Sequence, residues 1–404
     1  MRLTEIDALE LVLTAGCNLR CSYCYQNDKK ARSMEWSTLR ASLDVLLRSS
    51  TNDVQILFIG GEPLLEFPLI EQAVSYVAAC RRPEMNVRYN IITNGTLVTD
   101  AHVEFFRTHR FAVQLSFDGV PDAQDLRGRG TFTRLDALLD RLQTAAPEFV
   151  VRQLAVSITL LPETLKWFPS SVAYFYEKGI EDLRISPALK QTGHWPVDRI
   201  EELDRMFSEV FDLSLRHYRR TGKVPLQVFG RRDEMDGAAT GEGPICAVGS
   251  ARKLAVDVDG SALGCATFAT SYQTFPAVFL RNRIEALRLG RVDDAGLADA
   301  FTRLPGAARE TGLFTDKGQK HSAYGRCAEC RYLSSCSYCP VSIGQYGGNE
   351  DPRRVPDFLC AFNLVTNKYR ERFPWMSPSM EAMLAMAPPP SIHPALQELF
   401  FGGA

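Results

Sequence analysis

Three cysteines near the start of the chain have the spacing of a metal-cluster loop. Cys17, Cys21 and Cys24 form C-x3-C-x2-C, shortly after the apolar run Leu9–Leu13. Three thiolates on one short loop can hold three irons of a [4Fe–4S] cluster, whereas clusters that only transfer electrons normally have four cysteine ligands. The spacing therefore predicts a cluster whose fourth iron is open to another ligand. The alternative is a zinc loop, which usually has paired C-x2-C motifs.

A glycine-rich stretch follows the second apolar run. It reads FIGGEP at Phe58–Pro63. Gly60 and Gly61 allow the backbone to approach a ligand closely, and Glu62 offers a carboxylate to an ammonium group. The same letters also describe a tight turn in which Pro63 opens the next helix. The stretch is therefore either part of a binding site or a structural turn.

Two polar turns come later in the chain, ITNGT at Ile92–Thr96 and LSFDG at Leu115–Gly119. Their candidate functional side chains are Asn94, Ser116 and Asp118. Each sequence is also what an ordinary turn requires, and Asp118 in particular can serve only to organise its turn.

Seven further cysteines gather in the C-terminal part of the chain. Cys246 precedes and Cys265 ends a predicted β-hairpin with its turn at Asp259–Gly260. The other five are Cys327, Cys330, Cys336 and Cys339, in the pattern C-x2-C-x5-C-x2-C, and Cys360. The alternative for the four-cysteine pattern is one structural zinc, which leaves the remaining three cysteines without a role. Cys80 is expected to be a small buried side chain in a helix.

The composition is that of a globular protein with two or three domains. The chain has 404 residues, 45% of them hydrophobic and 23% charged, with a formal net charge of −2. This charge indicates neither a nucleic acid nor an anionic membrane as partner. No apolar run of about 18 residues is present, and acidic residues interrupt the N-terminus where a signal peptide is apolar. We expect a cytoplasmic protein, in which eleven cysteines indicate metal ligands rather than disulfides.

Short β-rich runs alternate with helical stretches in the first half of the chain. The expected strands are Leu9–Thr14, Val54–Ile59, Val87–Ile92, Ala112–Phe117, Val150–Ile158 and Leu183–Ser186. The expected helices are Ser37–Leu47, Leu64–Ala79, Asp100–Thr108, Arg134–Thr144, Trp167–Lys178 and Arg199–Tyr218. Successive β–α units imply parallel strands with right-handed crossovers. Six units are fewer than the eight of a closed barrel, so we expect a partial (β/α)6 TIM-like barrel with working residues after its strand ends.

The motifs together resemble a known family. The cysteine loop, with Tyr23 before its last cysteine, resembles the radical S-adenosylmethionine (SAM) superfamily, and the three later motifs occur in that family's order. The resemblance implies a [4Fe–4S] cluster on Cys17, Cys21 and Cys24 that binds SAM and yields a 5′-deoxyadenosyl radical. It implies a SAM pocket formed by Tyr23, Gly60, Gly61, Glu62, Asn94 and Ser116.

The C-terminal cysteines resemble the SPASM extension of radical SAM proteins, which carries two auxiliary [4Fe–4S] clusters beside a hairpin and short helices. By this resemblance, Cys246, Cys265 and Cys339 hold auxiliary cluster I. Auxiliary cluster II is held by Cys327, Cys330, Cys336 and Cys360. Cluster I then has one iron that is open or bound to an oxygen ligand, such as Asp257 or Asp259.

Two departures from the family pattern stand out. The usual histidine after Asp118 is missing, with Ala123 or Gln124 in its place, and the following arginine is Arg127 or Arg129. The last gap of the four-cysteine pattern has two residues where three are usual.

The expected domains are the radical SAM barrel at 1–221, a charged, glycine-rich linker at 222–245, the SPASM domain at 246–375 and a tail at 376–404.

The resemblance implies a radical SAM oxidoreductase that abstracts hydrogen from a residue of a ribosomally made precursor peptide, giving a crosslink or an oxidised residue. The alternatives are an anaerobic sulfatase-maturase-like enzyme and a small-molecule SPASM dehydrogenase. Sulfatase maturases have an aspartate directly after the hairpin cysteine, resembling a general base, where this chain has Ala266 after Cys265. A non-catalytic, metal-stabilised binding module does not explain the cysteine loop. No catalytic side chain is assigned.

The expected partners are the precursor peptide, an electron donor such as flavodoxin or ferredoxin, and a separate leader-peptide-binding protein. The last follows from the sixteen residues before Cys17, too few for the winged-helix domain of many maturases. Alternatively, the peptide adds a strand to an exposed sheet edge.

Overall fold

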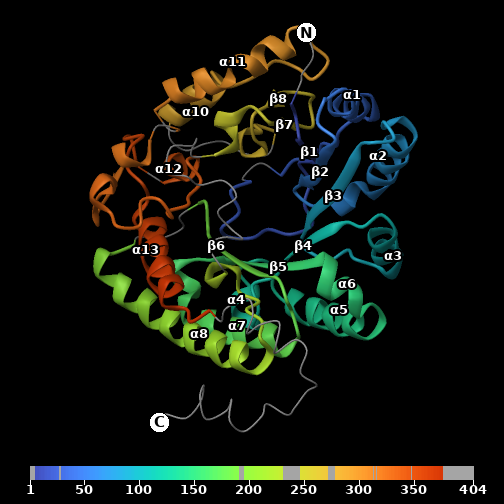
Figure 1. The fold of residues 1–404 in the computed structure, drawn as a ribbon. Helices are drawn as coiled ribbons and strands as arrows, with labels where there is room; N and C mark the ends of the chain where they lie inside the picture. Colours follow the sequence, from blue (N-terminus) through green and yellow to red (C-terminus); the bar gives the residue numbers. More distant parts are fainter. Residues whose placement is uncertain are drawn as a thin grey trace.

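Six parallel strands form the centre of the computed structural model, which describes residues 5–26, 29–190, 195–230, 246–271, 278–312, 314, 316–346 and 348–375. The strands are β1 (Ala8–Thr14), β2 (Asp53–Gly60), β3 (Asn86–Thr93), β4 (Ala112–Ser116), β5 (Leu154–Leu160) and β6 (Leu183–Pro187). They pair in sequence order, each parallel to the next. The strands form an arc that stays open on one side (Figure 1), so the predicted partial barrel is confirmed.

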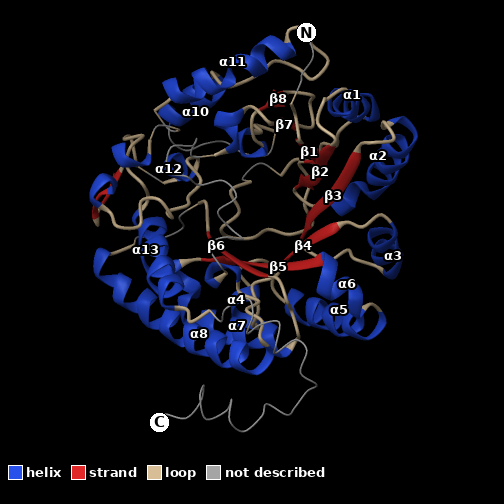
Figure 2. Cartoon of the chain, in the orientation of Figure 1, coloured by secondary structure: helices blue, strands red, loops and turns tan. Residues whose placement is uncertain are grey.

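Amphipathic helices cover the outer face of this arc (Figure 2). They are α1 (Trp36–Leu47), α2 (Phe67–Cys80), α3 (Asp100–Thr108), α4 (Pro121–Gln124), α5 (Thr131–Ala145), α6 (Pro147–Gln153), α7 (Phe168–Glu177) and α8 (Ile200–Thr221). In α5, for example, Leu135, Leu138, Leu139 and Leu142 are all buried. Their spacing puts them on one helical face, which packs on the strands.

The expected strand Val150–Ile158 is wrong in its first half. Residues Pro147–Gln153 form α6, and the strand starts at Leu154. Pro147 suits the first turn of a helix because its missing N–H has no helical partner there. A short apolar run does not by itself distinguish a strand from a buried helix, and here Phe149 and Val150 are buried against the core as part of α6.

The predicted hairpin exists, and it extends the barrel sheet. Strand β7 (Lys253–Val256) pairs antiparallel with β8 (Ala262–Leu263), and Gly260 in the turn has φ +86°, a conformation that favours glycine. Strand β7 also pairs in parallel with β1, so the sheet order is β6-β5-β4-β3-β2-β1-β7-β8. The C-terminal cysteines are thereby anchored to the strand that leads into the cysteine loop.

Both edges of this sheet are partly covered by the chain itself. At one edge Leu183 bridges to Leu226, and at the other edge Ala262 exchanges backbone hydrogen bonds with Gly290 and Leu289. The backbone groups of Leu183 and Ala262 are therefore not available to a peptide, and strand addition elsewhere along these edges stays a prediction.

The C-terminal region lies over the open side of the arc (Figure 1). It contains α10 (Val278–Glu285), α11 (Leu297–Glu310), α12 (Ser342–Gln345), α13 (Asp357–Arg372), and the two-residue strands β9 (His321–Ser322) and β10 (Gly325–Arg326). Helix α13 returns to the barrel, where Lys368 Nζ lies 2.6 Å from an Asp204 oxygen of α8 and Phe362 packs on Phe207. The described residues include no helix long and apolar enough to span a membrane. Most of the expected linker and the expected tail lie outside the described residues.

Candidate active site and cysteine centres

The cysteine loop follows the C-terminal end of β1, as barrel active-site loops do. The thiols of Cys17, Cys21 and Cys24 are half-buried and unpaired by disulfides, and they lie close enough to act on one another electrostatically. Burial raises the pKa of Cys21 to about 11, an effect that the nearby cations Arg127 and Lys29 oppose. Three convergent thiols beside two cations are a donor set that suits an iron–sulfur cluster.

Gly60 and Gly61 are needed for a close approach between β2 and the start of the cysteine loop. A Cβ on Gly60 would lie 2.5 Å from Thr14 O, and one on Gly61 would lie 2.1 Å from Gly16 O. Backbone hydrogen bonds at 2.8 and 2.9 Å, Gly61 N to Thr14 O and Glu62 N to Gly16 O, fix this contact. Because any side chain would separate the two segments, the packing of the chain by itself requires glycine at both positions.

The Glu62 carboxylate is fully buried and joins the ends of β2 and β3. Its Oε1 accepts hydrogen bonds from Leu64 N at 3.1 Å and Thr93 Oγ1 at 2.7 Å, and its Oε2 accepts one from Asn94 N at 2.8 Å. Burial raises the pKa of Glu62, and these hydrogen bonds oppose the increase. A carboxylate has about four acceptor positions, so Glu62 keeps capacity for one more donor. The structure therefore shows Glu62 building the turn, with one acceptor position unused.

Asn94 connects the end of β3 to the cysteine loop. Its Nδ2 donates to Asn18 Oδ1 at 2.9 Å and lies 3.9 Å from Cys17 Sγ, while Oδ1 accepts from Thr96 N at 3.0 Å. Asn94 is buried, which makes it a positioning residue for Cys17. Ser116 is half-buried at the end of β4.

A buried charged network below the loop was not predicted. Arg127 Nη2 donates to Asp118 Oδ1 at 2.7 Å and Nε donates to Oδ2 at 3.2 Å. The Tyr23 hydroxyl donates to the same carboxylate, and the Arg127 guanidinium lies 5.4 Å from the Tyr23 ring centroid. Thr159 N, in β5, donates to Asp118 Oδ1 at 2.9 Å. Asp118 therefore does more than organise its turn, since it joins two strands to the cysteine loop.

Burial and hydrogen bonds distinguish the candidate residues around this network. Arg127 is buried and paired, whereas Arg129 is exposed. Gln124 is fully buried and accepts a hydrogen bond from Asp118 N at 2.9 Å. The run DLRGRG after LSFDG contained both arginines. The sequence does not say which of two arginines two residues apart is the buried one.

The C-terminal cysteines divide into two groups in space. Cys339 interacts electrostatically with Cys265 and Cys246, and burial raises the pKa of Cys339 to about 12. The second group is Cys336 with Cys327, Cys330 and Cys360. The part of the chain that the structure describes contains no group of three or more His, Cys, Asp or Glu side chains placed to hold a single metal ion.

The two aspartates considered as oxygen ligands lie at the wrong end of the hairpin. Ala255 pairs with Leu263, a register that places Cys265 opposite Lys253, at the open end. Asp257 is fully buried at the turn, where its carboxylate accepts hydrogen bonds from Val258 N and Ser271. Asp259 Oδ1 accepts from Ser261 N at 2.9 Å. The expectation that either closes auxiliary cluster I is wrong.

Cys80, expected to be buried, is exposed at the end of α2.

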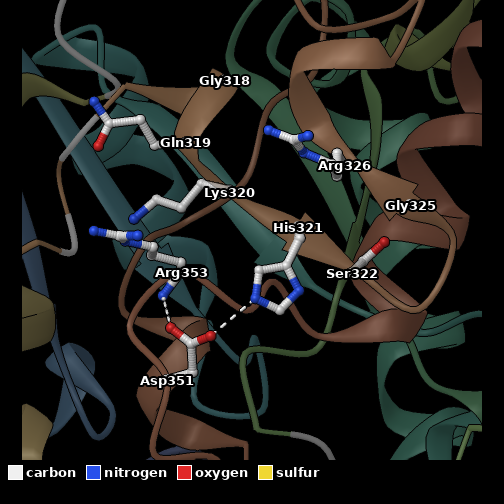
Figure 3. A pocket seen from close by; sticks show the side chains of 9 residues that line it. All are labelled: Gly318, Gln319, Lys320, His321, Ser322, Gly325, Arg326, Asp351 and Arg353. Atoms are coloured by element: carbon white, nitrogen blue, oxygen red, sulfur yellow. Dashed lines mark hydrogen bonds and ion pairs between the residues drawn. The ribbon is translucent and has the colours of Figure 1, made fainter.

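A cavity of about 820 Å³ lies beside the second cysteine group. Figure 3 shows Asp351 bonded to the His321 ring and to the backbone N–H of Arg353, with Lys320 above them and Arg326 farther along the rim. His321 Nε2 lies 2.8 Å from Asp351 Oδ2. Arg326 and Arg353 are the exposed cations of the lining, whereas the Lys320 ammonium is buried and donates to Gly312 O and Pro352 O.

The wall of this cavity contacts the cysteines directly. Ser322 Oγ donates to Cys360 Sγ at 3.1 Å, and Cys327 N donates to Lys320 O at 3.0 Å. A negatively charged group in the cavity would therefore sit close to the second cysteine group.

Comparison with known proteins identifies the first part of the chain. Residues 11–173 match the family model "Radical SAM superfamily". They belong to that superfamily. The radical SAM segment includes the cysteine loop, Glu62, Asn94 and the Asp118–Arg127 pair.

Relatives of this chain include a cysteine-type anaerobic sulfatase-maturating enzyme of Clostridium perfringens, 20% identical over 80% of this chain and 85% of that enzyme. An uncharacterized protein of Methanocaldococcus jannaschii is 39% identical over 28% of this chain, which spans 38% of that protein.

Two solved structures show how far the fold likeness extends. A structure entitled "Native anSMEcpe with bound AdoMet and Kp18Cys peptide" matches with a TM-score of 0.70 at 17% identity, over 90% of this chain and 97% of that one. Streptococcus suis SuiB bound to precursor peptide SuiA matches with a TM-score of 0.53 at 14% identity, over 88% and 76%. The likeness covers most of the chain, so the shared fold extends beyond residues 11–173 into the C-terminal region.

Proposed function

We propose that this protein is a peptide maturase, which removes hydrogen from a residue of a ribosomally made precursor peptide to give a crosslink or an oxidised residue. The observation that carries the proposal is the arrangement of the ten cysteines. One group of three lies on the barrel loop, and the C-terminal cysteines form a group of three and a group of four. Three redox centres suit a reaction in which an electron must leave the substrate.

The residues fit three [4Fe–4S] clusters and SAM. Cys17, Cys21 and Cys24 would hold the SAM-binding cluster, and Glu62 would accept the SAM ammonium group. When bound, SAM and this cluster supply the one-electron chemistry that breaks an unactivated C–H bond. The chain's own part is positional: Gly60 and Gly61 bring β2 against the loop.

The two C-terminal groups would hold the auxiliary clusters. Grouping Cys339 with Cys246 and Cys265 supports this division over one zinc on Cys327, Cys330, Cys336 and Cys339. The structural neighbours whose titles include bound peptides support a peptide as the substrate class.

The sulfatase-maturase-like alternative lacks its base here. Ala266 N donates to Glu10 Oε2 at 2.8 Å, and Glu10 Oε1 lies 3.0 Å from Lys253 Nζ. The carboxylate at this position is therefore held in an ion pair, which disfavours it as a proton acceptor.

Mass spectrometry of peptide products tests the proposal. The reduced, reconstituted enzyme is incubated with SAM and, in parallel, with the short peptide encoded beside its gene and with a cysteine-containing sulfatase peptide. Loss of hydrogen atoms from the encoded peptide supports the proposal. Conversion of only the sulfatase peptide to an aldehyde would establish the alternative instead.

The electron donor is an acidic redox protein of the flavodoxin or ferredoxin kind, docked at the cationic cavity. The support is the pair of exposed cations Arg326 and Arg353 in the lining and the contact of this lining with Cys360 through Ser322. Charge reversal in Arg326→Glu/Arg353→Glu should slow reduction by such a donor, most strongly at low salt. Reduction by dithionite should be unchanged. Arg152→Glu, at an exposed position on α6, is the control, and equal slowing by it would exclude this docking site.

A further inference from the structure

We propose that Lys253 is a positioning residue that donates a hydrogen bond to the Cys265 sulfur and so raises the reduction potential of auxiliary cluster I, while Glu10 lowers it. The inference rests on the proposed assignment of Cys246, Cys265 and Cys339 to that cluster.

The three side chains are in contact. Lys253 Nζ lies 3.7 Å from Cys265 Sγ and 3.0 Å from Glu10 Oε1. The Lys253 and Glu10 side chains are only 20% and 14% exposed. Glu10 Oε2 also accepts the hydrogen bond from Ala266 N at 2.8 Å. The ion pair is thus fixed at both ends, with its cation directed at the sulfur.

The sheet pairing explains why these residues meet. Strand β7 pairs with β1 so that Lys253 lies beside Ala8, and Glu10 points to the same face as Ala8 because side chains alternate along a strand. The hairpin register puts Cys265 opposite Lys253. The contact therefore exists only because the hairpin joins the barrel sheet, and it links β1 to the C-terminal cysteines.

Charge decides the sign of each residue's effect. Adding an electron makes a cluster more negative, and its reduction potential depends on net charge and on hydrogen bonds to its sulfurs. The Lys253 ammonium stabilises the reduced cluster by a charge-assisted hydrogen bond. The Glu10 carboxylate, beside the same cysteine, opposes reduction. The two partners of one ion pair thus have opposite effects on one potential.

Redox titration followed by electron paramagnetic resonance tests this in protein with Cys17, Cys21 and Cys24 changed to alanine, which leaves the auxiliary clusters. Lys253→Met should lower one midpoint potential, and Glu10→Gln should raise the same one. We expect each to change the reduction equilibrium constant by on the order of tenfold, or about 59 mV for one electron. Lys253→Arg keeps the charge and the donors, and it should restore the original potential.

Arg252→Met is the matched control, because Arg252 Nε pairs with Asp7 at 2.8 Å directly before the same two strands and is half-exposed. It should leave both potentials unchanged. A merely structural role of the Lys253–Glu10 pair would lower cluster content or the unfolding temperature in both variants without opposite shifts. If Lys253→Met does not retain the cluster, Glu10→Gln still tests the proposal: a raised potential supports it, and an unchanged or lowered potential overturns it.

Iron and sulfide content distinguishes a failure of the proposed function from a failure of the role proposed for Lys253. If the unsubstituted C-terminal cysteines bind no cluster, the proposed function is wrong. If the clusters are present and the two variants shift the potential in the same direction, or not at all, the role of Lys253 is wrong while the proposed function stands.

Discussion

Arg127 and Asp118 form a bidentate ion pair that is buried beneath the cysteine loop, with atom separations of 2.7 and 3.2 Å. Burial disfavours the charge on Arg127, but the carboxylate of Asp118 outweighs this effect, so the pKa of Arg127 lies above its ordinary value. The segment that carries Arg127 also binds the loop through Ser22 N and Leu126 O, 2.9 Å apart. The position of Cys21 and Cys24 therefore depends on this pair.

Arg127→Met should destabilise the protein strongly, because it leaves the Asp118 carboxylate buried without its cation. Breaking a buried pair costs about 3–5 kcal/mol, measurable by urea unfolding. Arg129→Met is the control: at its exposed position, a change within about 0.5 kcal/mol is expected. Equal effects of the two variants would contradict the structural role of Arg127.

Changing Cys17, Cys21 and Cys24 together to alanine should abolish formation of 5′-deoxyadenosine, because no open iron remains for SAM. Chromatography of the reaction mixture measures this product. Replacing the seven C-terminal cysteines should leave some SAM cleavage and no modified peptide. Cys80→Ala should change nothing, since Cys80 is exposed on α2. Continued cleavage by the triple variant would disprove the cluster assignment.

Anaerobically reconstituted protein should contain about twelve irons per chain, the sum of three four-iron clusters. Metal analysis together with sulfide determination measures this. About four irons with one zinc would show instead that the four-cysteine pattern is a structural zinc site.

Glu62→Gln should weaken SAM binding on the order of tenfold to a hundredfold, because a charge-assisted contact contributes roughly 1.5–3 kcal/mol. Isothermal titration with SAM gives the affinity. The variant should also lower the unfolding temperature, since an amide NH2 would replace an oxygen that accepts from Asn94 N or from Leu64 N and Thr93. Glu71→Gln, exposed on α2, is the control. Reduced stability with unchanged SAM affinity would show that Glu62 serves only the turn.

Auxiliary cluster I should have an iron without a cysteine ligand, since Asp257 and Asp259 lie at the far end of the hairpin. A thiol-bearing peptide should then perturb the electron paramagnetic resonance spectrum of this cluster. No change with the peptide bound elsewhere in the enzyme would indicate four protein ligands and a simple electron relay.

The sequence by itself determined the barrel and the chemical class of the site. Strands of apolar residues separated by amphipathic helices leave few arrangements other than a parallel β/α sheet, and the spacing of Cys17, Cys21 and Cys24 is local information. The predicted element boundaries were wrong where local preference was ambiguous. Residues Val150–Gln153, predicted as the start of a strand, form the end of α6.

Tertiary structure alone decided the contacts between distant segments. Nothing in the sequence says that β7 joins β1, that Lys253 and Glu10 meet beside Cys265, or that Arg127 rather than Arg129 is buried. Such choices depend on long-range pairing and on which charges are removed from water. These energetic contributions arise only when the whole chain is packed, because the free-energy cost of burying a charge depends on the partner that packing provides.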